Sequence, residues 1–184
     1  MAKDYLKLTH VPASAIIPRM KNFSGKPGDN NPNGLRSFCI TLDPDLAAAL
    51  FRDGWNIKIF DRAYRDATHQ NGKYVAFDQA IEPDGDPMVQ VAVSYRLYAP
   101  DIWIKNGMNY TQITEDTVSQ LDNFEIDEVR KLVIDPSYWE RNGKSGIKAY
   151  LKEFKAILVQ DEDDDDFFSD MPRSESSIPE VPFD

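Results

Sequence analysis

Alternating apolar and polar residues recur along this chain, and they restrict it to a fold built mainly from β-strands. The clearest run is MVQVAVSYRLY at 88–98, in which Val89, Val91 and Val93 would share one side of a sheet. RSFCITL at 36–42 and WNIKIFD at 55–61 show the same period of two, and the second run places Trp55 in the core. Strands of this kind bury one face, so they need a closed or layered sheet.

One short helix interrupts the strand pattern at DPDLAAALFRDG, residues 43–54. Asp43 is suited to cap its N-terminus, Pro44 fits the first helical position, and Gly54 can end it. The segment at 14–23 predicts an edge strand, because it carries Pro18, and the segment at 24–34 predicts a long loop. Further short strands are expected at 73–77, 101–105 and 128–134, with a turn at 83–87. Thr114 is suited to cap a second helix, with Val118 and Leu121 on its buried side.

The segment IKAYLKEFKAILV, from residue 147, fits both a helical stripe and a strand. The turn signal NGKSG precedes it at 142–146, and Lys148 and Lys152 would repel each other one turn apart in a helix. We therefore predict a long hairpin from 138 onward. About five strands with long connections favour a small Greek-key barrel over a parallel α/β sheet.

The negative charge of the chain is concentrated at one end. The whole sequence carries −10, yet the stretch from Asp161 to Asp184 holds ten acids against Arg173 alone, which is −9. The first 160 residues hold the other 21 acids and 20 bases, so they are almost neutral and can present a basic face. We expect a folded domain at 1–160 and a disordered acidic tail at 161–184.

Several classes of protein lack support in this sequence. Cys39 is the only cysteine, which excludes an intrachain disulfide and suits a small buried side chain in a reducing cytoplasm. The N-terminus MAKDYLKLTH lacks a secretory signal, and no apolar run is long enough to span a membrane. His10 and His69 are isolated, no phosphate-binding glycine loop occurs, and the aspartate run lacks the pattern of a calcium loop. We expect a cytoplasmic protein that is not an enzyme and that has no cofactor and no metal.

Basic and aromatic residues alternate on the predicted hairpin. In a strand, Lys148, Tyr150, Lys152 and Phe154 would lie on one face. Single-stranded nucleic acid is bound by that mixture, because cations follow the phosphates and rings stack on the bases. The alternative is that the rings pack under loops while the lysines are solvated. Similar mixtures elsewhere complete the candidate DNA-binding set: Arg19, Lys21, Phe23, Lys58, Phe60, Arg62, Tyr64, Arg96, Tyr98, Trp103, Lys105, Tyr138, Trp139 and Arg141.

Four stretches resemble a known family: NFSGKPGDNNPNGLRSFCITLD at 22–43, DGWNIK at 53–58, YWERNGKSGIKAYLK at 138–152, and the acidic end. They are similar to bacteriophage-type single-stranded DNA-binding proteins, which have an OB-fold and an acidic C-terminal tail. The resemblance implies an OB-fold-like barrel that coats single-stranded DNA during phage DNA replication, recombination or repair in the host cytoplasm. It implies no catalytic residue, and a homo-oligomer is compatible with it.

The same resemblance implies two roles for the tail, which are competition with DNA and recruitment of replication or recombination proteins. Bacterial relatives end in a phenylalanine, whereas Asp184 follows Phe183 here, which is a departure. The alternative function is an acidic interaction module or DNA mimic whose body does not touch nucleic acid. The candidate partner-binding residues of the tail are Phe167, Phe168, Val181, Pro182 and Phe183.

Overall fold

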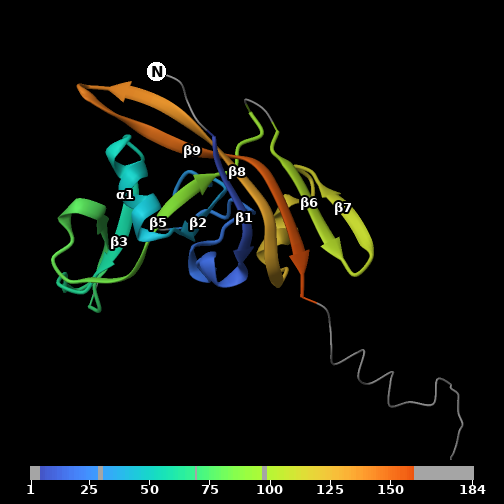
Figure 1. Ribbon diagram of the computed structural model, residues 1–184, viewed down its shortest axis with the longest axis horizontal. Coiled ribbons are helices and arrows are strands. Elements are labelled where there is room, and N and C mark those ends of the chain that lie inside the picture. Colours follow the sequence, from blue (N-terminus) through green and yellow to red (C-terminus); the bar gives the residue numbers. More distant parts are fainter. Residues whose placement is uncertain (1–4, 29–30, 69, 97–98, 160–184) are drawn as a thin grey trace, which may run out of the picture.

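The computed structural model describes residues 5–28, 31–68, 70–96 and 99–159 (Figure 1). The predicted acidic tail lies outside these residues. The predicted mainly β fold is confirmed. The strands are β1 Leu6–Pro12, β2 Ser37–Thr41, β3 Ile57–Asp61, β4 Lys73–Ala76, β5 Pro83–Ala92, β6 Asp101–Asn106, β7 Asn109–Ile113, β8 Ile126–Arg141 and β9 Lys144–Leu158. They are joined by the helix α1 Pro44–Arg52 and by the 3-10 turns η1 Ala13–Ala15, η2 Pro18–Met20, η3 Phe77–Gln79 and η4 Val118–Asp122.

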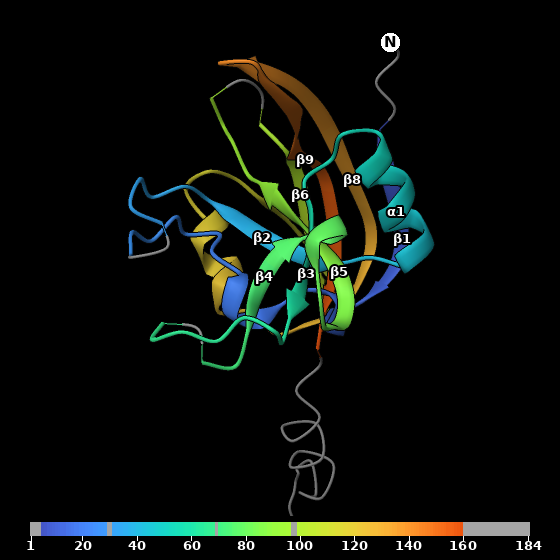
Figure 2. The same cartoon turned by 90° about the vertical axis from the view of Figure 1, so that its left-hand side faces the viewer.

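One mixed sheet contains all of these strands, and β9 is at its centre. β9 pairs with β8 along its length, with β5 near its middle and with β6 toward its end, and the last two pairings are parallel. The sheet order runs β1-β8-β9-β5-β3-β4, and β2 also pairs with β5. Isolated bridges join the segment after β1 to β2, at Ile16 with Ile40 and at Asn22 with Ser37. β1, β8, β9, β5 and β2 therefore surround the core in a barrel-like ring (Figure 2).

Local chemistry explains the helix and the hairpin turn, both of which were predicted. The Asp43 carboxylate accepts hydrogen bonds from the N–H groups of Asp45 and Leu46, at 3.1 and 3.4 Å, and so caps α1. Asn142 and Gly143 both have positive φ, 53° and 77°, which is the backbone of the tight turns that suit the twist of a β-hairpin. The choice of strand over helix for the segment from 147 is confirmed by β9.

A cluster of phenylalanines forms the centre of the core. The rings of Phe23 and Phe38 stack with centroids 5.1 Å apart, and Phe154 meets them edge-on at 5.9 and 5.8 Å. Trp55 is buried, as predicted. Cys39 is also buried, and this burial raises the pKa of its thiol to about 11. The thiol is therefore neutral near pH 7, which fits the predicted role as a small core side chain.

Several predicted boundaries are wrong. The strand expected at 14–23 is instead two 3-10 turns, η1 and η2, since proline at position 18 begins a turn there. The turn expected at 83–87 is the beginning of β5, where proline is tolerated as the first strand residue. The run at 88–98 leaves the sheet after Ala92. η4 replaces the helix expected after Thr114, although Val118 and Leu121 are buried as expected, and β7 was not predicted.

A β-bulge in β9 reverses the alternation of its side chains. Ile134 of β8 lies opposite Leu151, but Val133 lies opposite Glu153, so Lys152 is an extra residue. Ala149 and Leu151 face the core before the bulge, and Phe154 faces it afterwards. The prediction that Phe154 shares the exposed face of Lys148 and Tyr150 is therefore wrong, because a strict period of two does not survive the extra residue.

Removing the Phe154 ring should destabilise the fold strongly. Phe154→Ala empties the middle of the aromatic cluster and should lower the free energy of unfolding by roughly 3 to 5 kcal/mol. Tyr110→Ala removes a similar ring that is 67% exposed, so it is the matched control and should change stability by only about 0.5 kcal/mol. Urea denaturation followed by circular dichroism measures both values. Equal losses in the two variants would contradict the placement of Phe154 in the core.

Candidate nucleic-acid interface

Three adjoining hollows run along one side of the barrel, and we call them together the groove. The largest, of about 700 Å³, lies between the loop at 31–37, the turn after α1, β5 and the beginning of β9. A second, of about 610 Å³, follows the β8–β9 hairpin, and a third, of about 490 Å³, lies beside β5. Lys148 lines all three, so the hollows form one continuous surface.

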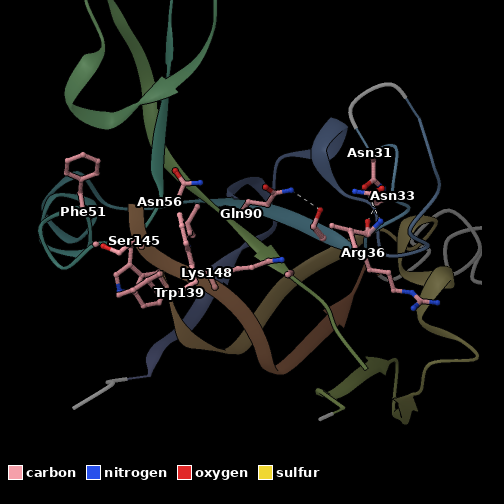
Figure 3. Close-up of a pocket in the computed structure, with 18 of the residues that line it drawn as sticks. Asn31, Asn33, Arg36, Phe51, Asn56, Gln90, Trp139, Ser145 and Lys148 are labelled. Carbon is pink, nitrogen blue, oxygen red and sulfur yellow. Dashed lines mark hydrogen bonds between the residues drawn. The ribbon is translucent and has the colours of Figure 1, made fainter. Parts of the chain in front are cut away.

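The two ends of the groove are formed by different elements. Figure 3 shows Trp139 toward one end of the largest hollow and Asn31 and Arg36 toward the other, with the Lys148 side chain between them. The Asn31 side chain accepts a hydrogen bond from the N–H of Leu35 at 3.0 Å and donates to the carbonyl of Lys26 at 3.1 Å. These bonds shape the predicted loop into a wall of the groove. The opposite wall is held to the α1–β3 turn because the N–H of Ile147 donates to the Gly54 carbonyl at 3.0 Å.

Positive charge is concentrated in the groove. Five cations line it against two carboxylates, Glu115 and Glu140. The first 160 residues as a whole are nearly neutral, so this excess is local and gives the groove a positive potential. The cations are Arg36, Arg96, Arg141, Lys144 and Lys148.

The residue opposite Trp139 on the hairpin is a glycine, which has no side chain to occupy the space of the indole ring. Trp139 of β8 lies opposite Gly146 of β9. A β-carbon at Gly146 would come within 3.1 to 3.2 Å of three atoms of the indole ring, so the glycine lets the ring lie close to β9 without a tight contact. Trp139 is 44% exposed. An accessible indole ring among cations is suited to stacking on a base.

Lys148 and Tyr150 act as a pair in the middle of the groove. The Lys148 Nζ lies 5.3 Å from the centre of the Tyr150 ring, within the range of a cation–π contact. Lys148 is exposed and Tyr150 is half-buried, so the ammonium group reaches solvent while the ring keeps one side accessible. Both side chains lie before the bulge in β9, where even-numbered residues point away from the core.

Arg36, like Lys144, is a groove cation that sequence reasoning missed. Its guanidinium carbon lies 5.7 Å from the Tyr95 ring centre, and its Nη1 is 3.8 Å from a carboxylate oxygen of Glu115. Its buried Nε and the buried Tyr95 hydroxyl have no hydrogen-bond partner among the described residues. Burial raises the pKa of Tyr95, so the hydroxyl remains protonated at neutral pH. An arginine whose terminal nitrogen makes only a long ion pair is suited to take up a phosphate.

The groove contains only part of the predicted set. Arg96, Trp139, Arg141, Lys148 and Tyr150 line it together. Tyr138 is exposed on the same hairpin, opposite Ile147. Lys152 lies at the bulge, with its Nζ 4.9 Å from the Tyr5 ring centre.

Other predicted residues lie away from the groove or inside the protein. On and after β3, the Phe60 ring meets that of Tyr74 at 5.3 Å, Arg62 pairs with Asp84 at 2.9 Å, and Tyr64 lies under Lys73 at 4.6 Å. Phe23 and Phe154 are core residues, so their assignment to DNA stacking is corrected. The predicted residues Lys58, Arg19, Trp103 and Lys105 line none of the three hollows, and neither does Lys21.

Lys21 has a structural contact instead. Its Nζ donates to the carbonyl of Phe124 at 3.3 Å, and partial burial lowers the pKa of its ammonium group. Nearby, the Asp122 carboxylate accepts hydrogen bonds from the N–H groups of Phe23 and Ser24, at 2.6 and 3.0 Å. These contacts fasten the segment after η2 to η4. The predicted residues Tyr98, Phe167, Phe168, Val181, Pro182 and Phe183 lie outside the described residues.

In the part of the chain that the structure describes, no helix is long and apolar enough to cross a membrane. Within the same ranges, no group of three histidine, cysteine, aspartate or glutamate side chains is placed to hold a metal ion.

Comparison with known proteins gives one family and two similar structures. Residues 4–183 match the family described as "Putative phage ssDNA-binding domain". The C-terminally truncated single-stranded DNA-binding protein from bacteriophage Enc34 is 14% identical, with a TM-score of 0.44, over 85% of this chain and 87% of that one. The Enc34 protein in complex with ssDNA is 14% identical, with a TM-score of 0.43, over 85% and 86%. Curated proteins give no match.

Proposed function

The chain belongs to the family of phage ssDNA-binding domains, and we propose that it coats and protects single-stranded DNA during phage DNA replication, recombination or repair. The observation that carries this proposal is the groove, in which five cations surround Trp139 and Tyr150 on one continuous surface. The cations would neutralise phosphates while the two rings stack on bases, an arrangement that tolerates any base.

Arg36 could bind a DNA phosphate in place of its present partner, Glu115. The carboxylate of Glu115 occupies one side of the Arg36 guanidinium at 3.8 Å in the free protein. A phosphate offers more acceptor oxygens and suits the arginine fork, so it would displace this long contact at the terminal nitrogens of Arg36. In this proposal the groove binds DNA and performs no catalysis on it, and the protein works in the cytoplasm of the host cell.

The tail from Asp161 to Asp184 would have two roles. It carries −9 and follows directly after the folded domain, so it would compete with DNA for the cationic groove at high effective concentration. Its apolar end, with Val181, Pro182 and Phe183, would recruit replication or recombination proteins once DNA displaces the acidic part. Phe167 and Phe168 would contribute further aromatic anchors.

The alternative is an acidic interaction module or DNA mimic whose body does not bind nucleic acid. The local excess of cations in the groove favours DNA binding over this alternative, because a DNA mimic needs acids on its folded surface.

The protein should prefer single strands to duplex and show little base specificity. Stacking on Trp139 and Tyr150 needs unpaired bases, and the two rings do not distinguish one base from another. Fluorescence anisotropy with a labelled oligonucleotide, its matched duplex and several base compositions measures this preference. Equal or tighter binding to the duplex would contradict the proposal, and no binding at low salt would favour the DNA-mimic alternative.

Two groove variants should separate stacking from charge. Tyr150→Ala should weaken single-strand binding by roughly 1 to 3 kcal/mol with little change in salt dependence, because it removes a ring and no charge. Lys148→Ala should weaken binding and reduce the slope of log K against log salt by about 0.7. Lys7→Ala removes a cation from the exposed face of β1 and is the matched control. If all three variants fold and bind like the parent, the groove is not the binding surface.

Truncation after Gln160 should tighten single-strand binding, because it removes a competitor of charge −9. The gain should be greatest at low salt, since the screening length is about 10 Å at 0.1 M and only about 3 Å at 1 M.

Phe183→Ala should leave DNA affinity nearly unchanged but abolish most capture of partner proteins from a host-cell extract. If the truncated protein shows unchanged DNA affinity at low salt and still captures the same proteins, the tail is only solubilising.

A further inference from the structure

A second cationic and aromatic surface lies where β6, β7, β8 and β9 meet, and we call it the β6 patch. It surrounds a hollow of about 350 Å³ that shares no lining residue with the groove. All of its charged lining residues are cations. The residues that define it are Trp103 and Lys105 from β6, Tyr110 from β7, Arg130 from β8 and Lys155 from β9.

Strand pairing brings these side chains to one face. Trp103 lies opposite Lys155 in the parallel β6–β9 pair, and Lys105 lies opposite Tyr110 in the antiparallel β6–β7 pair. Ile102 and Ile104 alternate with them and are buried, so Trp103 and Lys105 point outward. The bulge at Lys152 turns Lys155 toward the same outer face. The sequence predicted Trp103 and Lys105 as DNA contacts, but their neighbours come from three other strands.

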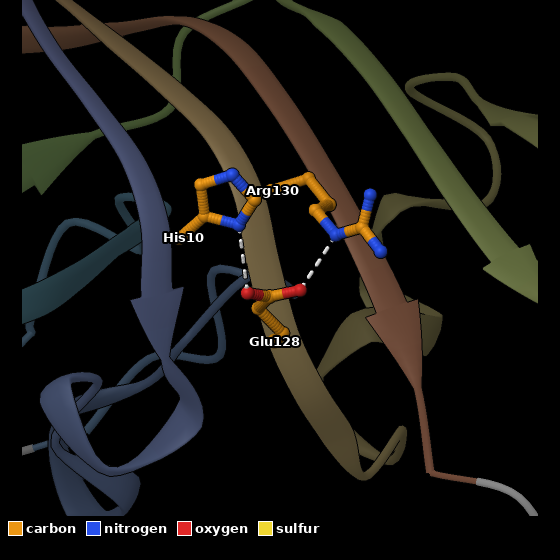
Figure 4. Close-up of polar contacts among 3 residues, drawn as sticks. All are labelled: His10, Glu128 and Arg130. Atoms are coloured by element: carbon orange, nitrogen blue, oxygen red, sulfur yellow. Dashed lines mark hydrogen bonds and ion pairs between the residues drawn. The ribbon is translucent and has the colours of Figure 1, made fainter.

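The carboxylates beside the patch hold its side chains in position. Asp101 accepts a hydrogen bond from the Trp103 indole Nε1 at 2.9 Å, which orients the ring. Glu128 accepts from Arg130 Nε at 2.6 Å and contacts His10 Nδ1 at 3.1 Å. The hydrogen bond from Arg130, with that from His10, holds the pKa of Glu128 below its usual range. Figure 4 shows the two terminal nitrogens of Arg130 pointing away from Glu128, and the Arg130 side chain is 55% exposed.

The chemistry of the patch repeats that of the groove. The Lys105 Nζ lies 5.7 Å from the Tyr110 ring centre, comparable to the 5.3 Å between Lys148 and Tyr150. Tyr110 is 67% exposed, which leaves much of its ring accessible. Rings held among cations, with no carboxylate lining the hollow, suit the bases and phosphates of a single strand.

We propose that the β6 patch is a second contact for the DNA strand that occupies the groove, so that one strand follows β9 from one surface to the other. β9 carries Tyr150 in the groove and Lys155 in the patch, five residues or roughly 17 Å apart along an extended strand. Lys152 lies between them. This inference rests on the proposed function of the groove and extends it to a longer binding site.

Oligonucleotide length distinguishes the patch from the groove. An oligonucleotide of about 6 nucleotides fits the groove alone, and one of about 20 can reach both surfaces, since single-strand sites on such domains span about 4 to 16 nucleotides. In the full chain, Tyr110→Ala should weaken binding of the long oligonucleotide about five-fold or more and leave that of the short one unchanged. Met108→Ala removes a 92% exposed side chain from the same hairpin, outside the patch, and should change neither.

Cross-linking tests the patch independently of the groove. Long oligonucleotides that carry bromodeoxyuridine should cross-link to peptides containing Trp103 or Tyr110, whereas short ones should react only at groove peptides. The inference is overturned if the long oligonucleotide gives no patch cross-link, or if Tyr110→Ala leaves its affinity unchanged. A change in short-oligonucleotide affinity in Tyr110→Ala would also overturn it, because the patch would then act on the groove itself and would not simply add a contact for a longer strand. If Tyr150→Ala affects neither length, the groove fails as the binding surface while the cross-links still decide the patch.

Discussion

The pairing of β8 with β9, together with its bulge at Lys152, is the constraint on which the rest of this structure depends. β8, β5 and β6 all pair with β9. Which β9 residues face inward therefore decides which side chains fill the core of the barrel. Without the extra residue, the strand would turn Phe154 outward and remove the third ring of the aromatic core. The same extra residue directs Lys155 outward. The bulge at Lys152 therefore affects both the packing of the core and the presentation of a cation on the surface.

The aromatic rings at the centre of the core differ in chemistry from those on the two candidate surfaces. Phe23, Phe38 and Phe154 carry no polar atom and form the centre of the barrel. Trp139, Tyr150 and Tyr110 keep a polar atom and an accessible ring face, and they lie among lysines and arginines. An amphipathic ring can remain ordered at a surface because one edge is apolar and the other can stay hydrated. The alternation of cations and rings in the sequence did not distinguish these two groups, because phenylalanine and tyrosine occupy equivalent positions in that pattern.

The net charge of the chain does not describe its folded part, because the negative charge is concentrated at one end. The chain carries −10, but −9 of this belongs to the acidic end, and the groove of the folded body is lined by five cations. Carboxylates near these surfaces are mostly engaged with cations, as in the pairs of Arg36 with Glu115 and Lys131 with Glu153. The hydrogen bond from Lys131 lowers the pKa of Glu153, so this partner stays ionised at neutral pH. Such pairs reduce the repulsion that a polyanion would meet on the barrel.

The sequence by itself determined the features that depend on neighbouring residues. These are the period of β2 and β3, the cap of Asp43 on α1, the turn at Asn142 and Gly143, and the burial of Trp55. Only the tertiary structure decided that Phe154 faces inward and that Arg36 joins the groove beside Tyr95 and Glu115. The physical reason is that a bulge exists only relative to a partner strand, and that the neighbours of Arg36 lie more than fifty residues further along the chain. Alternation and capping act over a few residues, whereas a binding surface is assembled by strand pairing between distant segments.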